Sequence, residues 1–190
     1  MKLFFLASIV ASDPLKEDFK SIINTFESQG HVVIYKHVFE NLMDLEKSTV
    51  NALERRAKKL INEMYSCEAV IFEGTHSSTG AGYFLSAALQ KSIPVLFAHQ
   101  EKNYSGLYLA DPNRLLIIKQ YHIINKIGFE KIAKKFIKFA EKKRLGNRFN
   151  LMISDSMNEY LNKKAKETHL SKADFIRNLV YSKIAEDEKV

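Results

Sequence analysis

The sequence has a single cysteine, Cys67, and no apolar run long enough to cross a membrane. One cysteine excludes a disulfide framework and a cysteine-rich zinc site, which favours a reducing compartment. The apolar run after Lys2 is stopped by Asp13 and Pro14, too early for a secretory signal of about 15 to 30 residues. No other run approaches the roughly 18 residues of a membrane span. We therefore expect a cytoplasmic protein with no membrane partner.

Metal-ligand spacing is also missing from the sequence. His31, His37, His76 and His99 are not spaced like the ligands of a metal site, and single histidines near strand ends are usually structural. His76 is the exception to consider, because it falls in a loop where it could contact a phosphate. We expect neither a metal ion nor a cofactor.

Positive charge is concentrated in the last third of the chain. The net charge is +7; residues 1–128 contain 14 Lys or Arg against 13 Asp or Glu, whereas residues 129–190 contain 15 against 9. This asymmetry predicts an appended element that meets a polyanion, although a solvated lysine-rich helix face would give the same count.

Short apolar runs alternate with helical patterns over the first two thirds of the chain. The expected strands are 3–9, 31–38, 68–74, 93–99 and 114–121, and the expected helices are 14–29, 48–66, 81–91 and 128–144. Strands that alternate with helices are typical of a parallel sheet covered on both faces. The fold class is therefore α/β, with a doubly wound parallel sheet of five strands.

A smaller strand–helix–helix module is expected after this domain. Residues 148–154 alternate between apolar and polar side chains, and helical patterns follow at 155–168 and 172–185. Ser171 is placed to cap the second helix, with Asp174 as its reciprocal partner. A module of this size cannot bury its own apolar faces. We expect a homodimer, or a higher even oligomer, in which two such strands pair antiparallel.

Residues 148–184 resemble a ribbon-helix-helix DNA-binding domain of the Arc and methionine repressor type, in "RFNL" at the strand and "LSKADFIRNLV" at the second helix. The resemblance implies double-stranded DNA as partner. Base edges would meet Arg148, Asn150 and Met152, and the amides of Ser171 and Lys172 would hold a backbone phosphate. A pure dimerisation module is the alternative. The domains would then be 1–145 and 146–190.

Residues 3–100 resemble the nucleoside 2-deoxyribosyltransferase superfamily, most nearly its deoxynucleotide N-hydrolase branch. The resemblance rests on "LASIVAS" after the first strand and "THSSTGAGYFLSAA" after the third. Both segments follow strands, at the edge of the sheet where ligands of such folds bind. A nucleotide or sugar-phosphate ligand is expected there, on Ser8, His76, Ser78, Gly80 and Gly82.

The same resemblance points to missing catalytic groups. The family motif ends in a glutamate where this chain has Phe84, the family aspartate of the preceding helix falls near Leu60, and a basic residue of the first loop falls at Val10. Cleavage of an N-glycosidic bond needs a carboxylate beside the sugar. Glu73, at the end of the third strand, is a weak candidate for a displaced carboxylate, and a surface or capping role is its alternative.

These observations lead us to expect a DNA-binding transcriptional regulator whose α/β domain senses a nucleotide or sugar phosphate without catalysis. An active nucleotide N-glycosidase or deoxyribosyltransferase, with rearranged catalytic residues and a C-terminal dimerisation module, is the second hypothesis. An antitoxin-like protein that binds an acidic partner through its basic tail is the third.

Overall fold

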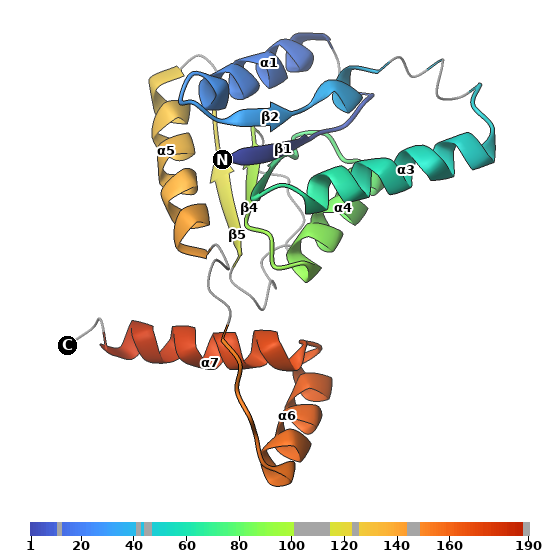
Figure 1. The fold of residues 1–190 in the computed structure, drawn as a ribbon. Helices are drawn as coiled ribbons and strands as arrows, with labels where there is room; N and C mark the ends of the chain where they lie inside the picture. The colour runs from blue at the N-terminus through green and yellow to red at the C-terminus, as the bar shows by residue number, and fades with distance from the viewer. Residues whose placement is uncertain are drawn as a thin grey trace. The chain divides into compact units, whose positions relative to one another are not determined.

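The chain divides into two compact units, Met1–Arg144 and Leu145–Val190. In a computed structural model of the protein, the structure describes residues 1–10, 13–40, 43, 47–100, 115–122, 126–143 and 149–187 (Figure 1). Each unit is described separately below.

The first unit is built on a parallel sheet of five strands in the order β2-β1-β3-β4-β5. The strands are β1 (Lys2–Leu6), β2 (Val32–Ile34), β3 (Ala69–Glu73), β4 (Val95–His99) and β5 (Leu116–Gln120). Strand β1 pairs with both β2 and β3, with Phe4 level with Ile34 and with Val70. The predicted doubly wound, five-stranded parallel sheet is confirmed.

Helices cover both faces of this sheet, and each face has its own apolar core. The helices are α1 (Asp13–Glu27), α3 (Val50–Tyr65), α4 (Thr79–Gln90) and α5 (Lys126–Lys143). Figure 1 shows α1 with α5 on one side of the sheet and α3 with α4 on the other. Strand side chains alternate accordingly: Leu3 and Phe5 join the α1/α5 core, whereas Phe4 and Leu6 join the α3/α4 core.

The second predicted strand was too long. Residues 31–38 were expected to be a single strand, but β2 ends at Ile34 and the chain turns into the 3₁₀ helix η1 (Lys36–Phe39). The apolar pattern of this stretch serves two elements, because Val38 and His37 are buried from the 3₁₀ turn. The turn places His37 beyond the carboxyl end of β2, where a longer strand would not have put it.

The second unit contains α6 (Asp155–Thr168) and α7 (Lys172–Asp187). The expected strand is not formed within the described chain: residues 149–154 have no strand partner there, and Arg148 lies outside the described residues. Among the residues described, no helix is both long and apolar enough to span a membrane.

Candidate active site

The strand order places one edge of the sheet in the position where ligands bind in this architecture. The order 2-1-3-4-5 has its topological switch point between β1 and β3, and ligands of doubly wound sheets bind beyond the carboxyl ends of the strands at that point. The last paired residues there are Leu6 and Phe72. Ser8 and Gly74 each lie two residues beyond that pair, so the two segments predicted to bind a ligand leave the sheet side by side.

Glu73 is the carboxylate at this edge, and its side chain is fully buried. Its Oε1 accepts hydrogen bonds from the Thr75 backbone amide at 3.1 Å, from the Thr75 hydroxyl and from the Tyr121 hydroxyl at 3.0 Å. Its Oε2 has no hydrogen-bond partner among the described residues. One oxygen is therefore fixed by the protein while the other is left for a different partner.

Burial also sets the electrostatics of this carboxyl. Removal from water raises the pKa of Glu73, and the hydrogen bonds from Thr75 and Tyr121 oppose that rise. Burial raises the pKa of Tyr121 as well, with the nearby Glu73 charge as the second cause, so the phenol remains a hydrogen-bond donor. Gln100 extends the network, because its Nε2 donates to the Tyr121 hydroxyl at 3.2 Å.

The loop after Glu73 is shaped by close packing and by a helix cap. A Cβ atom on Gly74 would lie 2.3 Å from the Phe97 ring, so only glycine lets β4 pack against the start of this loop. Ser78 is the N-cap of α4, and its side chain accepts a hydrogen bond from the Ala81 amide. The amides of the first turn of α4 therefore face the same sheet edge, with the positive end of the helix dipole.

Gly80 has a different environment from Gly74. A Cβ atom on Gly80 would have nothing within 4 Å, so neither packing nor backbone conformation requires glycine at this position. Gly82 lies two positions further along the first turns of α4, and His76 is exposed in the loop. The open space over Gly80 is consistent with a ligand approaching the helix terminus closely.

Two further polar groups are buried near the ends of β1 and β2. The Ser8 hydroxyl and His37 Nε2 have no hydrogen-bond partner within the described residues. The His37 ring stacks on Phe4 at 4.6 Å, and burial, reinforced by the Arg56 charge, lowers the pKa of His37 to about 4. His37 was expected to be merely structural; the sequence pattern gave no sign that its ring would end beside the candidate site.

Phe84 occupies the position of the family glutamate and belongs to the apolar core instead. It is half-buried on α4 against the α3/α4 core, with its ring nearly parallel to that of Phe4 at 6.3 Å. Leu60, at the predicted aspartate position, is buried in the same core, and Val10, at the predicted basic position, is exposed. None of these three positions therefore carries a charged side chain.

The residues assigned to DNA contacts lie in the second unit. Asn150 is exposed, and Met152 is 97% exposed.

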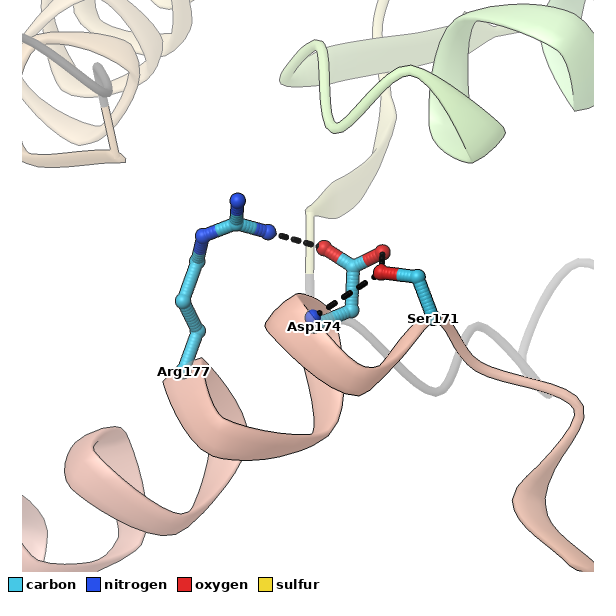
Figure 2. Close-up of polar contacts among 3 residues, drawn as sticks. All are labelled: Ser171, Asp174 and Arg177. Atoms are coloured by element: carbon cyan, nitrogen blue, oxygen red, sulfur yellow. Dashed lines mark hydrogen bonds and ion pairs between the residues drawn. The ribbon is translucent and has the colours of Figure 1, made fainter. Parts of the chain in front are cut away.

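Ser171 accepts a hydrogen bond from the Asp174 amide at 3.1 Å and donates one to the Asp174 carboxylate, which also pairs with Arg177 (Figure 2). Ser171 therefore caps α7, as predicted. Lys172 donates to Asn158 of α6 at 2.7 Å.

No group of three or more metal-ligating side chains occurs in the part of the chain that the structure describes. The chemistry of the site rests on a buried carboxyl group, hydroxyl groups and the amides of a helix terminus.

Comparison with known proteins gives several relatives, of which two are described here. The chain is 30% identical over 138 residues to a protein of Methanosarcina barkeri named "Putative 2′-deoxynucleoside 5′-phosphate N-hydrolase 1", a match that covers 72% of this chain and 84% of that protein. The protein of the same name from Methanosarcina mazei is 30% identical over 120 residues, covering 63% of this chain and 74% of the relative. No family model matches the chain.

A solved structure with a similar arrangement is that of a CMP N-glycosidase from Clostridium botulinum. It has 15% sequence identity and a TM-score of 0.49, and the match covers 71% of this chain and 99% of that one.

The relatives contradict the expectation of a DNA-binding regulator with a non-catalytic α/β domain. Proteins that match most of this domain are named as hydrolases of deoxynucleotides. The expectation read the three missing family groups, at Phe84, Leu60 and Val10, as the loss of catalysis, and it gave too little weight to Glu73 and too much to the basic C-terminal third. Glu73 is a buried carboxyl at the same sheet edge, and a surplus of lysine is also what a solvated helix surface contains.

Proposed function

Because the chain belongs to the 2′-deoxynucleoside 5′-phosphate N-hydrolase family, we propose that it hydrolyses the N-glycosidic bond of a nucleoside 5′-monophosphate. The products are the free base and a sugar 5-phosphate. The observation that carries this proposal is Glu73, a buried carboxyl with one unpartnered oxygen at the switch point of the sheet.

The reaction defines what the site must supply. The bond between C1′ and the base nitrogen breaks with its electron pair leaving on the base, and positive charge develops on the sugar. The oxygen of a water molecule forms the new bond to C1′, and the two protons of that water end on the sugar hydroxyl and on the departing base. An ionised oxygen beside the sugar stabilises the charge that develops.

Glu73 fits this requirement through its two unequal oxygens. Oε1 is held by Thr75 and Tyr121, so the carboxyl plane is fixed without the help of a substrate. Oε2 is a buried acceptor without a protein partner, which is costly unless a water molecule or a substrate hydroxyl satisfies it. The raised pKa makes Glu73 a stronger base than an ordinary carboxylate, suited to accepting a proton from the attacking water.

The start of α4 fits the 5′-phosphate. Ser78 caps this helix, and the space over Gly80 is open, so an anion can reach the first-turn amides. The Ser8 hydroxyl, buried at the end of β1, is a further hydrogen-bonding group for the sugar phosphate. With Phe84 at the position of the family glutamate, that position cannot form a covalent bond to the sugar, and we infer direct displacement by water.

The proposal is tested by measuring base release from the deoxynucleoside and ribonucleoside 5′-monophosphates by chromatography. The wild-type chain is expected to release base from at least one of them and to be much less active on the nucleoside without phosphate. Glu73→Gln is expected to lower kcat by about 100-fold or more, the scale of a lost catalytic base or charge. The control is Glu54→Gln, which removes an exposed carboxylate of α3 and should leave kcat unchanged.

Two results would contradict the proposal in different ways. Absence of base release from every monophosphate would remove the glycosidase function. Full activity in a correctly folded Glu73→Gln chain would keep the function and remove Glu73 from its mechanism. Because Glu73 also anchors Thr75 and Tyr121, the melting temperature of each variant is measured beside its activity.

A further inference from the structure

Gln100, directly after β4, contacts both hydroxyl groups that hold the Glu73 carboxyl. Its backbone amide donates a hydrogen bond to the Thr75 hydroxyl at 3.0 Å, and its side-chain Nε2 donates one to the Tyr121 hydroxyl at 3.2 Å. Each of these hydroxyls in turn donates to Glu73 Oε1. Two chains of hydrogen bonds therefore start at one residue and end on the same carboxyl oxygen.

The direction of these hydrogen bonds follows from what each group can donate. An N–H group cannot accept a hydrogen bond, so neither hydroxyl can turn its single proton toward Gln100. Among the described partners of the two hydroxyls, the acceptor that remains for both protons is Glu73 Oε1. The Thr75 backbone amide adds a third donor to the same oxygen.

Asp18, on helix α1, determines which end of the Gln100 side-chain amide faces the site. Gln100 Nε2 also donates a hydrogen bond to Asp18 Oδ2. An ionised carboxylate only accepts hydrogen bonds, so the amide nitrogen, and not the amide oxygen, has to face Asp18. The second hydrogen on that nitrogen is then directed to Tyr121. A reversed amide would instead present its oxygen to Tyr121 and compete with Glu73 for the tyrosine proton.

A carboxyl group with three donors on one oxygen takes up a proton on the other. A proton on Glu73 Oε1 would have to displace a hydrogen bond from Thr75 or Tyr121, which is costly in a buried site. Glu73 Oε2 has no such partner within the described residues. Oε2 is therefore the oxygen that is able to act as a base.

We propose that Gln100, oriented by Asp18, is a positioning residue that confines proton transfer to Oε2 of Glu73. It does so by directing the two hydroxyl donors onto Oε1. The proton that Oε2 takes from the attacking water passes to the departing base, so the carboxyl returns to its ionised form. Gln100 acts through Glu73 and not on the substrate. This inference rests on the proposed glycosidase function.

The titratable groups around this network act in known directions. Burial raises the pKa of Glu73, while the hydrogen bonds from Thr75 and Tyr121 oppose that rise, as does the charge of His76. Burial also raises the pKa of Tyr121, and the charges of Glu73 and Asp18 add to that rise. Weakening the hydrogen bond from Tyr121 therefore leaves the Glu73 carboxylate less stabilised, and its pKa rises further.

The first test is the pH dependence of kcat/KM in Gln100→Met, which removes the side-chain amide and keeps the backbone amide. We expect the acid limb to move to higher pH and kcat at neutral pH to fall by about ten-fold, with KM unchanged. Tyr121→Phe is expected to move the limb at least as far. The double variant should move it no further than Tyr121→Phe alone, because the amide acts through the hydroxyl. Gln120→Met is the matched control, because Gln120 is exposed and donates to the backbone carbonyl of Gln100.

Asp18→Leu is a second variant, which removes the acceptor that orients the amide. The acid limb is expected to move in the same direction as in Gln100→Met. Glu17→Leu is its control, because Glu17 is the exposed neighbour on α1 and pairs with Lys20 at the surface.

Titration of Glu73 itself separates this inference from the proposed function. Infrared difference spectra between each chain and its Glu73→Gln counterpart follow protonation of this carboxyl without substrate. The midpoint is expected at higher pH in Gln100→Met and Asp18→Leu than in the wild-type chain. Such a shift in a chain that releases no base would support Gln100 as the residue that positions Glu73 and would overturn the glycosidase function. An unmoved midpoint in both variants would overturn this inference, whether or not the chain is active.

Discussion

The polar side chains near the switch point differ in which of their atoms have hydrogen-bond partners within the protein. Glu73 Oε1 has three donors, whereas Glu73 Oε2, Ser8 Oγ and His37 Nε2 are buried without partners among the described residues. Buried polar atoms in folded proteins are nearly always paired. The three exceptions lie at or just beyond the carboxyl ends of three adjacent strands, the edge where ligands of such sheets bind.

Phe84 provides a test of the site by gain of function. Phe84→Glu restores the carboxylate that the family motif has at this position, and we expect base release to increase by about ten-fold or more if the sugar reaches this part of α4. The lost packing of the ring against Phe4 is expected to cost roughly 1–2 kcal/mol of stability, because the ring is half-buried.

Tyr83→Glu is the control for this substitution, because Tyr83 is the exposed neighbour of Phe84 on the same helix. Base release is measured for both variants under identical conditions. Equal rates in the two variants would show that a carboxylate at position 84 does not act on the sugar.

His37 gives a pH prediction with a defined sign. Its pKa in the folded chain is about 4, below the usual 6.5, so the unfolded chain binds the proton first as the pH falls. The contribution of His37 to the free energy of unfolding is therefore fully present above pH 6.5 and is lost as the pH falls from about 6.5 to 4. The loss from this residue is up to about 3 kcal/mol.

His37→Phe keeps an aromatic ring against Phe4 and removes the titrating group. Urea unfolding of the α/β domain at several pH values is expected to show a smaller loss of stability on acidification than in the wild-type chain. His122→Phe, which makes the same substitution at an exposed position, is the matched control. If His37→Phe loses as much stability on acidification as the wild-type chain, groups other than His37 cause that loss.

Part of the site could be predicted from the sequence, and the reason is positional. Ser8 and the weaker candidate Glu73 can be singled out because each lies near the carboxyl end of an apolar strand, and parallel strands bring such positions to one edge. The hydrogen bond between Tyr121 and Glu73 spans 48 residues, and no local pattern encodes it. His37 was missed because its segment has the composition of a strand, while the turn that places it depends on packing against Phe4.

Among the elements, β3, the loop after it and α4 form the structural unit that builds the site. Two glycines in this unit have opposite structural roles. Gly74 is required by the Phe97 ring, whereas Gly80 has open space where a side chain would be.

Alanine substitutions at these glycines are expected to separate stability from binding. Gly74→Ala should destabilise the α/β domain by about 1–3 kcal/mol, because the new methyl group would overlap the Phe97 ring. Gly80→Ala should be neutral or stabilising by up to about 1 kcal/mol, since alanine favours a helix. It should also raise KM for the nucleotide, because the methyl group would enter the space over the amides. Thermal unfolding and initial rates check the two effects; a strongly destabilised Gly80→Ala chain would contradict this explanation.

The elements themselves were predicted with uneven success for identifiable reasons. Helix α6 was predicted at its exact bounds, because Ser154 caps its start and the chain leaves it through His169 in a left-handed conformation. The strand expected at 148–154 is not formed in the described chain, although its alternation of side chains is present. Alternation reports which face is apolar; strand formation also requires a neighbour, which the sequence of one chain does not identify.

For the whole molecule, the division into two units has a thermodynamic consequence. We expect calorimetry of the full-length chain to show two transitions. The transition of the α/β domain should be independent of protein concentration, and that of the C-terminal unit should move to higher temperature as concentration rises, because association stabilises the folded form. A single transition that is independent of concentration would contradict both the independence of the units and the expected association of two C-terminal units.

The place of β1 in the sheet also determines when folding can be completed during synthesis. This strand lies between β2 and β3, so its second neighbour emerges only after residue 73 has left the ribosome. Residues 145–190 follow last, and at about 5–20 residues per second their translation takes roughly 2–9 s. The nascent α/β domain thus has several seconds to complete its sheet before the exposed apolar residues of the C-terminal unit leave the ribosome and can associate with another polypeptide.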